Sequence, residues 1–89
     1  LMLIGDFICS TSSHKPSLII KEEGESILIT IDEYNGDYKW IKKYEADKII
    51  LTPEEELSLV LKYGEWFYNM HENIMQDIII KNLNYYFKK

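Results

Sequence analysis

The stretch 52–87 constrains this chain most, because it opens with a helix start signal and then carries more apolar side chains than one small sheet covers. Thr52 can accept a hydrogen bond from a backbone N–H, and Pro53 loses nothing at a position where no donor is needed. The carboxylates at 54–56 face the positive end of the helix dipole, and Glu55 completes a capping box with Thr52. The sequence therefore predicts that a helix begins at Pro53.

Helical periodicity predicts which side of this stretch is buried. With about 100° of rotation per residue, one broad side collects most of the apolar residues, and we expect that side to face the core. The predicted core side consists of Leu57, Val60, Leu61, Gly64, Phe67, Tyr68, His71, Ile74, Met75, Ile78, Ile79, Tyr85 and Tyr86.

A second set of apolar residues falls outside that side, at positions where a helix in water normally carries polar groups. Large apolar anchors contribute most to binding where an interface dehydrates them, so we predict that this set contacts another protein. The predicted contact residues are Leu59, Tyr63, Trp66 and Met70 on one flank, followed by Ile80, Leu83 and Phe87 on the other.

The same stretch need not be one helix. Its length exceeds that of most helices in globular proteins, and Gly64 weakens it from inside. The apolar excess also changes flank along the stretch, which indicates a bend near residues 70–73. Two helices packed against each other would bury part of the excess without any partner, and this alternative stays open.

Short β-branched runs in the first half of the chain predict strands. The runs at 18–20 and 27–31 flank a turn in which Gly24 can take a positive φ angle, so they should form a hairpin. Apolar runs at 1–9 and 48–51 predict two more strands, and the second runs straight into the helix start.

The predicted fold class is therefore α+β. Residues 2–51 should form a meander of four or five antiparallel strands, and residues 53–87 should form one long or two shorter helices packed on one face of it. At 89 residues, the chain has the size of a single domain.

Asn35-Gly36 is the strongest turn signal, since both residues tolerate the left-handed angles of a two-residue hairpin loop. A loop of that kind fixes the register of the flanking strands. The predicted pairs are Glu33 with Tyr38, Asp32 with Lys39, Ile31 with Trp40, Thr30 with Ile41, and Ile29 with Lys42.

A net charge of −5 and the complete absence of arginine weigh against nucleic-acid binding. Phosphate binders normally carry a positive excess, and the planar arginine fork reads guanine and clamps phosphate. The alternative comes from the segment 38–44, where Tyr38, Trp40 and Tyr44 interleave with lysines as on surfaces that stack unpaired bases. A single-stranded nucleic-acid-binding module is thus the second hypothesis, behind protein binding.

The sequence lacks a recognisable catalytic or metal-binding pattern. His14 and His71 are far apart and have no zinc-type spacing, and His71 falls on the predicted core side of the helix. Cys9 is the only cysteine and ends an apolar run, which is typical of a buried, inert thiol. We therefore predict no enzymatic activity, no cofactor and no metal.

Two broader expectations complete the sequence reading. A single cysteine fits a reducing compartment and no apolar run approaches a membrane span, so we expect a cytoplasmic protein.

Abundant Ile, Lys, Asn and Tyr, which have AT-rich codons, suggest a low-GC bacterium or one of its phages. We predict a small acidic, non-catalytic protein that works by binding another protein. It would act either as a homo-oligomer or as an inhibitor, immunity or regulatory factor.

Overall fold

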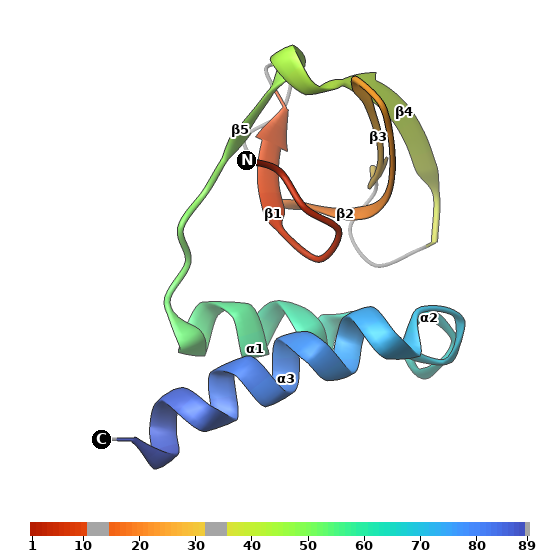
Figure 1. The fold of residues 1–89 in the computed structure, drawn as a ribbon. Coiled ribbons are helices and arrows are strands. Elements are labelled where there is room, and N and C mark those ends of the chain that lie inside the picture. Colours follow the sequence, from red (N-terminus) through yellow and green to blue (C-terminus); the bar gives the residue numbers. More distant parts are fainter. Residues whose placement is uncertain (11–14, 32–35, 89) are drawn as a thin grey trace.

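A computed structural model describes residues 1–10, 15–31 and 36–88, and it confirms the α+β class. Within these residues, one antiparallel sheet of five strands, in the order β4-β3-β2-β1-β5, precedes three helical segments (Figure 1). The elements are β1 (Phe7–Ser10), β2 (Ser17–Glu23), β3 (Ser26–Thr30), β4 (Tyr38–Lys42), the 3₁₀ helix η1 (Lys43–Glu45), β5 (Ala46–Lys48), α1 (Pro53–Lys62), α2 (Glu65–Met70) and α3 (Glu72–Phe87).

The β2–β3 hairpin forms as predicted. Its strands pair up to Glu23 and Ser26, which leaves a two-residue turn of Gly24 and Glu25. Gly24 has a φ of 58°, a region that a residue without a Cβ enters at no steric cost. The hairpin is longer than its apolar runs, because the polar residues near the turn continue the ladder.

The register predicted around Asn35-Gly36 is wrong. Thr30 pairs with Tyr38 and Ile27 pairs with Ile41, and the N–H of Ile31 bonds to the carbonyl of Asp37. The connection is therefore longer than two residues, and the predicted pairs at Asp32 and Glu33 lie outside the described residues. The observed register places Ile41 on the same buried face as Ile27, whereas the predicted register would have turned Ile41 to the other face.

Strand β5 begins earlier than the apolar run predicted. It covers Ala46–Lys48, and Ala46 pairs with Ser10 of β1. The short helix η1 turns the chain before β5. The N–H of Ile49 still bonds to the carbonyl of Phe7 in β1, and the chain then leads to α1, with Ile49 and Leu51 half-buried against the core that the helices share with the sheet.

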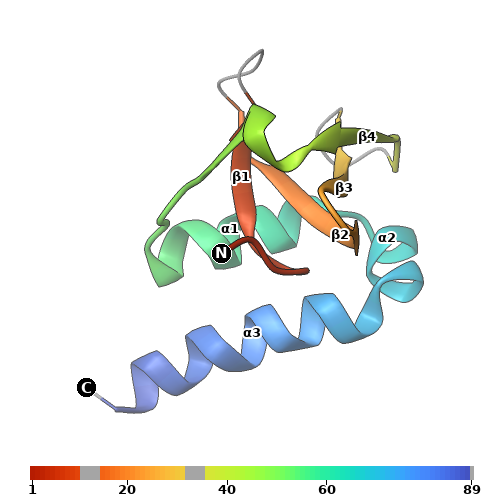
Figure 2. The same cartoon turned by 45° about the horizontal axis from the view of Figure 1, so that its top comes forward.

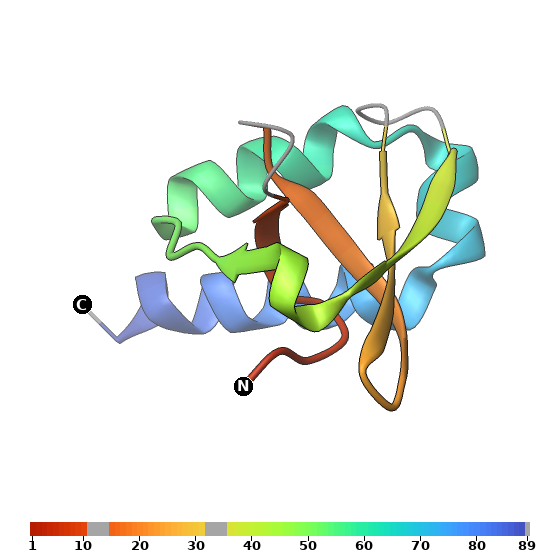
Figure 3. The same ribbon diagram turned by 90° about the horizontal axis from the view of Figure 1, so that it is seen from above.

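The chain crosses from one edge of the sheet to the other through η1 alone. Edge strands of a flat five-stranded sheet lie about 19 Å apart, at about 4.8 Å per strand spacing. Four Cα–Cα steps from Lys42 to Ala46 span at most about 15 Å, and a 3₁₀ turn shortens that reach. The sheet must therefore curl. Figure 1 shows its strands arranged around a common interior, and in Figure 3 they cross at steep angles.

Curling produces a core made by the sheet itself. Its six buried members come from strands: Ile8, Ile19, Ile27, Ile29, Ile41 and Ala46. Alternation along β1 and β2 sends the neighbouring side chains of Phe7 and Leu18 to the other face, where they join a second core with the helices. The helical members of that second core are Val60, Tyr63, Phe67, Met75 and Ile78.

Helix α1 starts with the predicted capping box. The N–H of Glu55 bonds to Thr52 Oγ1 at 3.1 Å, and the N–H of Thr52 bonds to Glu55 Oε1 at 3.0 Å. The helical stretch then breaks at Tyr63–Gly64, where α2 begins after Gly64, and again at His71, inside the predicted bend region. It is therefore neither one helix nor two, but three segments.

Helices α1 and α3 pack against each other and run in opposite directions beneath the sheet (Figure 1). Figure 2 shows α2 at one end of this helical layer and the C-terminus at the other. This arrangement decides which side chains of α3 remain open to solvent.

Candidate functional site

The seven predicted contact residues do not form one patch. Leu59 and Tyr63 lie in or near the core, Trp66 and Met70 lie on α2, and the other three lie in the C-terminal half of α3. Because α2 and the C-terminus are at opposite ends of the helical layer, these groups face different surroundings (Figure 2).

Tyr63 is buried, so it offers no surface to a partner in this fold. It is 6% exposed, its ring centroid lies 4.3 Å from that of Phe67, and its hydroxyl lies 3.5 Å from Thr30 Oγ1. Leu59 is half-buried against the same core. The core side of α1 is thus rotated toward the predicted contact flank, and Leu61, predicted to be buried, is 85% exposed.

Trp66 supports the fold from the surface. A Cβ atom added at Gly36 would collide with the Trp66 indole, and Gly36 has a φ of 85°. Both observations require glycine beneath the ring. The indole is still 57% exposed, and Met70 on the same helix is 59% exposed.

The clearest unpaired apolar surface lies on α3. Ile80, Leu83 and Phe87 are 55%, 41% and 82% exposed. At about 100° per residue they fall within about 60° of one another around the helix axis. We call these three residues the α3 stripe. Their spacing of three and then four residues is that of a helix seam that packs on another helix.

The part of α3 that carries the stripe has few charged residues around it. The same helical face continues toward the start of α3 with Gln76, and Asn73 and Asn84 border it. All three are exposed. Glu72, which accepts a hydrogen bond from Gln76, and Asp77 bring charge near the start of α3, whereas within 79–87 the only charged residue is Lys81, which pairs with Glu56.

A polar contact links β4 to the break between α2 and α3. The hydroxyl of Tyr38 lies 2.6 Å from His71 Nε2, and both rings approach Phe67. Burial raises the pKa of Tyr38 and lowers the pKa of His71, so both neutral forms are favoured. A phenol that donates to an unprotonated Nε2 fits these states.

The β4 surface keeps only part of the predicted stacking platform. Trp40 is 46% and Tyr44 is 84% exposed, and Lys42, on the same face of β4 as Trp40, is exposed as well. Tyr38, however, is tied to His71, and Lys43 pairs with Glu22. The aromatic and cationic groups left for a single strand of nucleic acid are therefore fewer than the sequence suggested.

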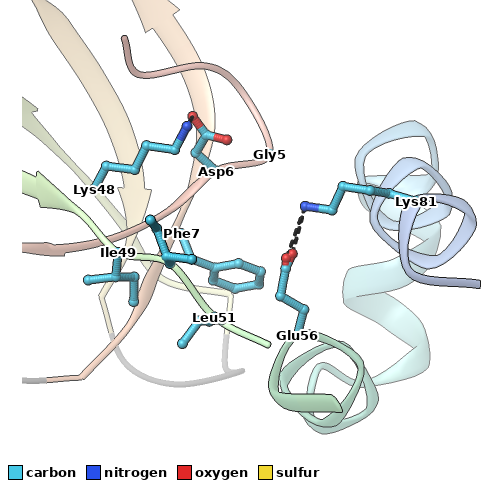
Figure 4. Close-up of a pocket in the computed structure, with 9 residues that line it drawn as sticks. Gly5, Asp6, Phe7, Lys48, Ile49, Leu51, Glu56 and Lys81 are labelled. Carbon is cyan, nitrogen blue, oxygen red and sulfur yellow. Dashed lines mark hydrogen bonds and ion pairs between the residues drawn. The ribbon is translucent and has the colours of Figure 1, made fainter. Parts of the chain in front are cut away.

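A charged cleft of about 250 Å³ lies between the start of β1, the connection to α1 and α3 (Figure 4). Glu56 points into it and is 6% exposed, while Lys81 reaches it from solvent. The Lys81 ammonium lies 2.7 Å from Glu56 Oε1 and 2.9 Å from Oε2, and the hydrogen bond is formed to Oε2. Oε1 is buried with the ion pair as its only polar contact.

Glu56 was missed by the sequence reading, which explained 54–56 as helix-start carboxylates alone. Its spacing to Val60, Tyr63 and Phe67 is that of one helix face, and this signal identifies it as buried. Lys81 carried no such signal, because it lies 25 residues away on another helix.

Within the described ranges, no group of three or more His, Cys, Asp or Glu side chains is placed to hold a metal ion. None of the helices in those ranges is both long and apolar enough to cross a membrane.

Comparison with known proteins adds no relative. The chain matches no protein-family model, no curated protein and no solved structure.

Proposed function

We propose that this chain is a non-catalytic protein-interaction domain that acts through the α3 stripe. The observation that supports it is the exposure of Ile80, Leu83 and Phe87 on one side of α3. Helix seams with this spacing bury their apolar side chains against a second helix. The expected partner is therefore a protein that presents a helix with a matching apolar, uncharged face.

The size of the stripe indicates moderate affinity. Fully burying one Leu, Ile or Phe side chain stabilises a contact by about 1.5–3 kcal/mol. Association costs at least about 4 kcal/mol in lost translational and rotational freedom. The three side chains are 41–82% exposed, so each gains only the part of that amount that corresponds to its exposed area. The surplus is therefore small, which suits a reversible inhibitor, immunity or regulatory factor rather than a permanent complex.

Affinity capture from a lysate of the source organism tests the proposal with two matched variants. Leu83→Glu places a charge in the stripe, whereas Ile50→Glu places the same charge at a 95% exposed residue outside α3. We expect the partner to be captured by the wild type and by Ile50→Glu and to be lost with Leu83→Glu. Equal capture by both variants, or no stripe-dependent capture and no self-association, would refute the proposal.

Binding of single-stranded nucleic acid is the second candidate, favoured by the exposed Trp40 and Tyr44 and by Lys42 on the same face of β4 as Trp40. Titration with a short single-stranded oligonucleotide at several salt concentrations separates it from protein binding. Affinity that falls steeply with salt and disappears with Trp40→Ala would support stacking on β4. An oligonucleotide that leaves tryptophan fluorescence unchanged at low salt removes this candidate.

A further inference from the structure

We infer that the partner on the α3 stripe is a second copy of this chain, joined by antiparallel pairing of the two α3 helices. The inference deepens the proposed function and rests on it, since both concern Ile80, Leu83 and Phe87. Three features of the structure lead to it: the distribution of charge, the order of side chains along the stripe, and the position of the polar residues on the same face.

Charge favours a self-contact at this face. The chain carries 15 Asp and Glu against 10 Lys, so two copies repel each other through most of their surfaces. Within 79–87, the segment that carries the α3 stripe, Lys81 is the only charged residue, and it pairs with Glu56. A basic partner would be recognised through carboxylates. A two-fold contact instead brings the same surface of both copies together, so a charged residue at its centre would face its own copy and repel it.

The order of side chains along the stripe is self-complementary. Leu83 lies between Ile80, about 4.5 Å away along the axis, and Phe87, about 6 Å away, at about 1.5 Å per residue. In an antiparallel pair with Leu83 at the two-fold axis, Leu83 meets its copy. Ile80 then meets Phe87 of the second copy, so the smaller side chain lies opposite the larger one at both ends of the contact.

Polar residues on the same face distinguish this arrangement from a parallel one. A parallel two-fold pair would bring Gln76 against its own copy and continue toward Asn73, so exposed amides would be buried at the seam. The antiparallel pair centred on Leu83 keeps the overlap on the three apolar residues. The geometry therefore favours opposite helix directions.

Sedimentation equilibrium tests whether the dimer exists. We expect the wild type at high micromolar concentration to have twice the 10.6 kDa chain mass. Leu83→Glu should raise the dimer dissociation constant by at least about 100-fold, because the symmetric contact contains the buried charge twice. Ile50→Glu should behave as the wild type. A wild type that stays a monomer, or a Leu83→Glu variant that stays a dimer, overturns the inference.

Disulfide trapping tests the helix direction in a Cys9→Ser background, which removes the native thiol. Leu83→Cys should form a covalent dimer on mild oxidation. Ile80→Cys alone should form no disulfide between chains. A mixture of Ile80→Cys and Phe87→Cys chains with different tags should form the mixed disulfide. Efficient self-linking by Ile80→Cys would instead show a parallel pair and reject the antiparallel geometry.

The inference and the proposed function can fail separately. A monomeric wild type that captures a different protein in a Leu83-dependent manner rejects the second copy as partner and leaves the interaction function standing. Neither self-association nor Leu83-dependent capture would reject both.

Discussion

Both long faces of α3 are rich in apolar side chains, yet one face is buried in the core and the other is exposed to solvent. On the inner face, Met75 and Ile78 are 0% and 3% exposed, and they pack with Phe7 and Leu18 of the sheet. On the outer face, the α3 stripe is 41–82% exposed. Apolar content alone therefore does not decide burial in this helix; the positions of α1 and the sheet do.

Polar groups on the inner side are satisfied locally. Asn82 is 3% exposed, and its Nδ2 donates to the carbonyl of Ile78 at 2.8 Å in its own helix. Lys81 pairs with Glu56 of α1. Changes on the inner face should thus reduce the free energy of unfolding, whereas changes on the outer face should alter association and leave the monomer intact.

The largest expected effect is that of Met75→Ala on the inner face. Removing a fully buried methionine side chain should lower the free energy of unfolding by about 2–5 kcal/mol, because the lost contacts leave a cavity. Urea denaturation measures it, with the exposed Gln76→Ala as control. If Met75→Ala does not fold, Met75→Leu should fold with a loss below about 1.5 kcal/mol. A loss from Met75→Ala no larger than that of the control would break the comparison.

Lys81→Met should have the next largest effect, because it leaves the buried carboxylate of Glu56 without its cation. We expect a loss of about 1–3 kcal/mol in urea denaturation, below the full value for a buried pair because the Lys81 side chain is 62% exposed. The double variant Glu56→Gln/Lys81→Met should recover part of the loss. A double variant less stable than Lys81→Met would show that the ion pair does not account for the effect.

A smaller effect concerns the pH dependence of stability at His71, where α3 begins. Burial lowers the pKa of His71 in the folded state, so the unfolded chain binds more protons as the pH falls through its ordinary value of about 6.5. Stability should therefore be greatest above that value and decline as the pH falls from about 7.5 to about 5.5. Thermal unfolding across this range should show a flatter profile for His71→Gln. Identical slopes for both chains would exclude this role.

Local sequence signals predicted much of the fold. The capping box at Thr52 and the turn at Gly24 depend on residues within a few positions of each other. The register after Asn35-Gly36 failed because the strongest turn signal competes with a tertiary requirement, the burial of Ile41 inside the curled sheet.

The exposed apolar surface could be predicted only in part from the sequence. Treating 52–87 with one continuous helical phase placed Tyr63 beside Trp66 on an open flank, although Tyr63 ends α1 and lies in the core. The break at Gly64 resets the phase, and no local pattern determines which side α1 and the sheet then cover. The Glu56–Lys81 pair was hidden for the same reason, since its partners meet only when α3 folds back along α1.

The smallest effect on monomer stability is expected for Leu83→Glu, and it provides the sharpest test of the comparison. Most substitutions on an exposed helix face change the free energy of unfolding by about 0.5 kcal/mol or less, and Leu83 is not part of either core. At low micromolar concentration, where a weak dimer is dissociated, Leu83→Glu and the wild type should melt at nearly the same temperature.

At high concentration the two proteins should separate, because association stabilises only a chain that can dimerise. The melting temperature of the wild type should rise with protein concentration, whereas that of Leu83→Glu should stay constant. Differential scanning calorimetry over a wide concentration range measures both. A Leu83→Glu chain already destabilised at low concentration would place Leu83 in the inner core and remove the distinction between the two faces of α3.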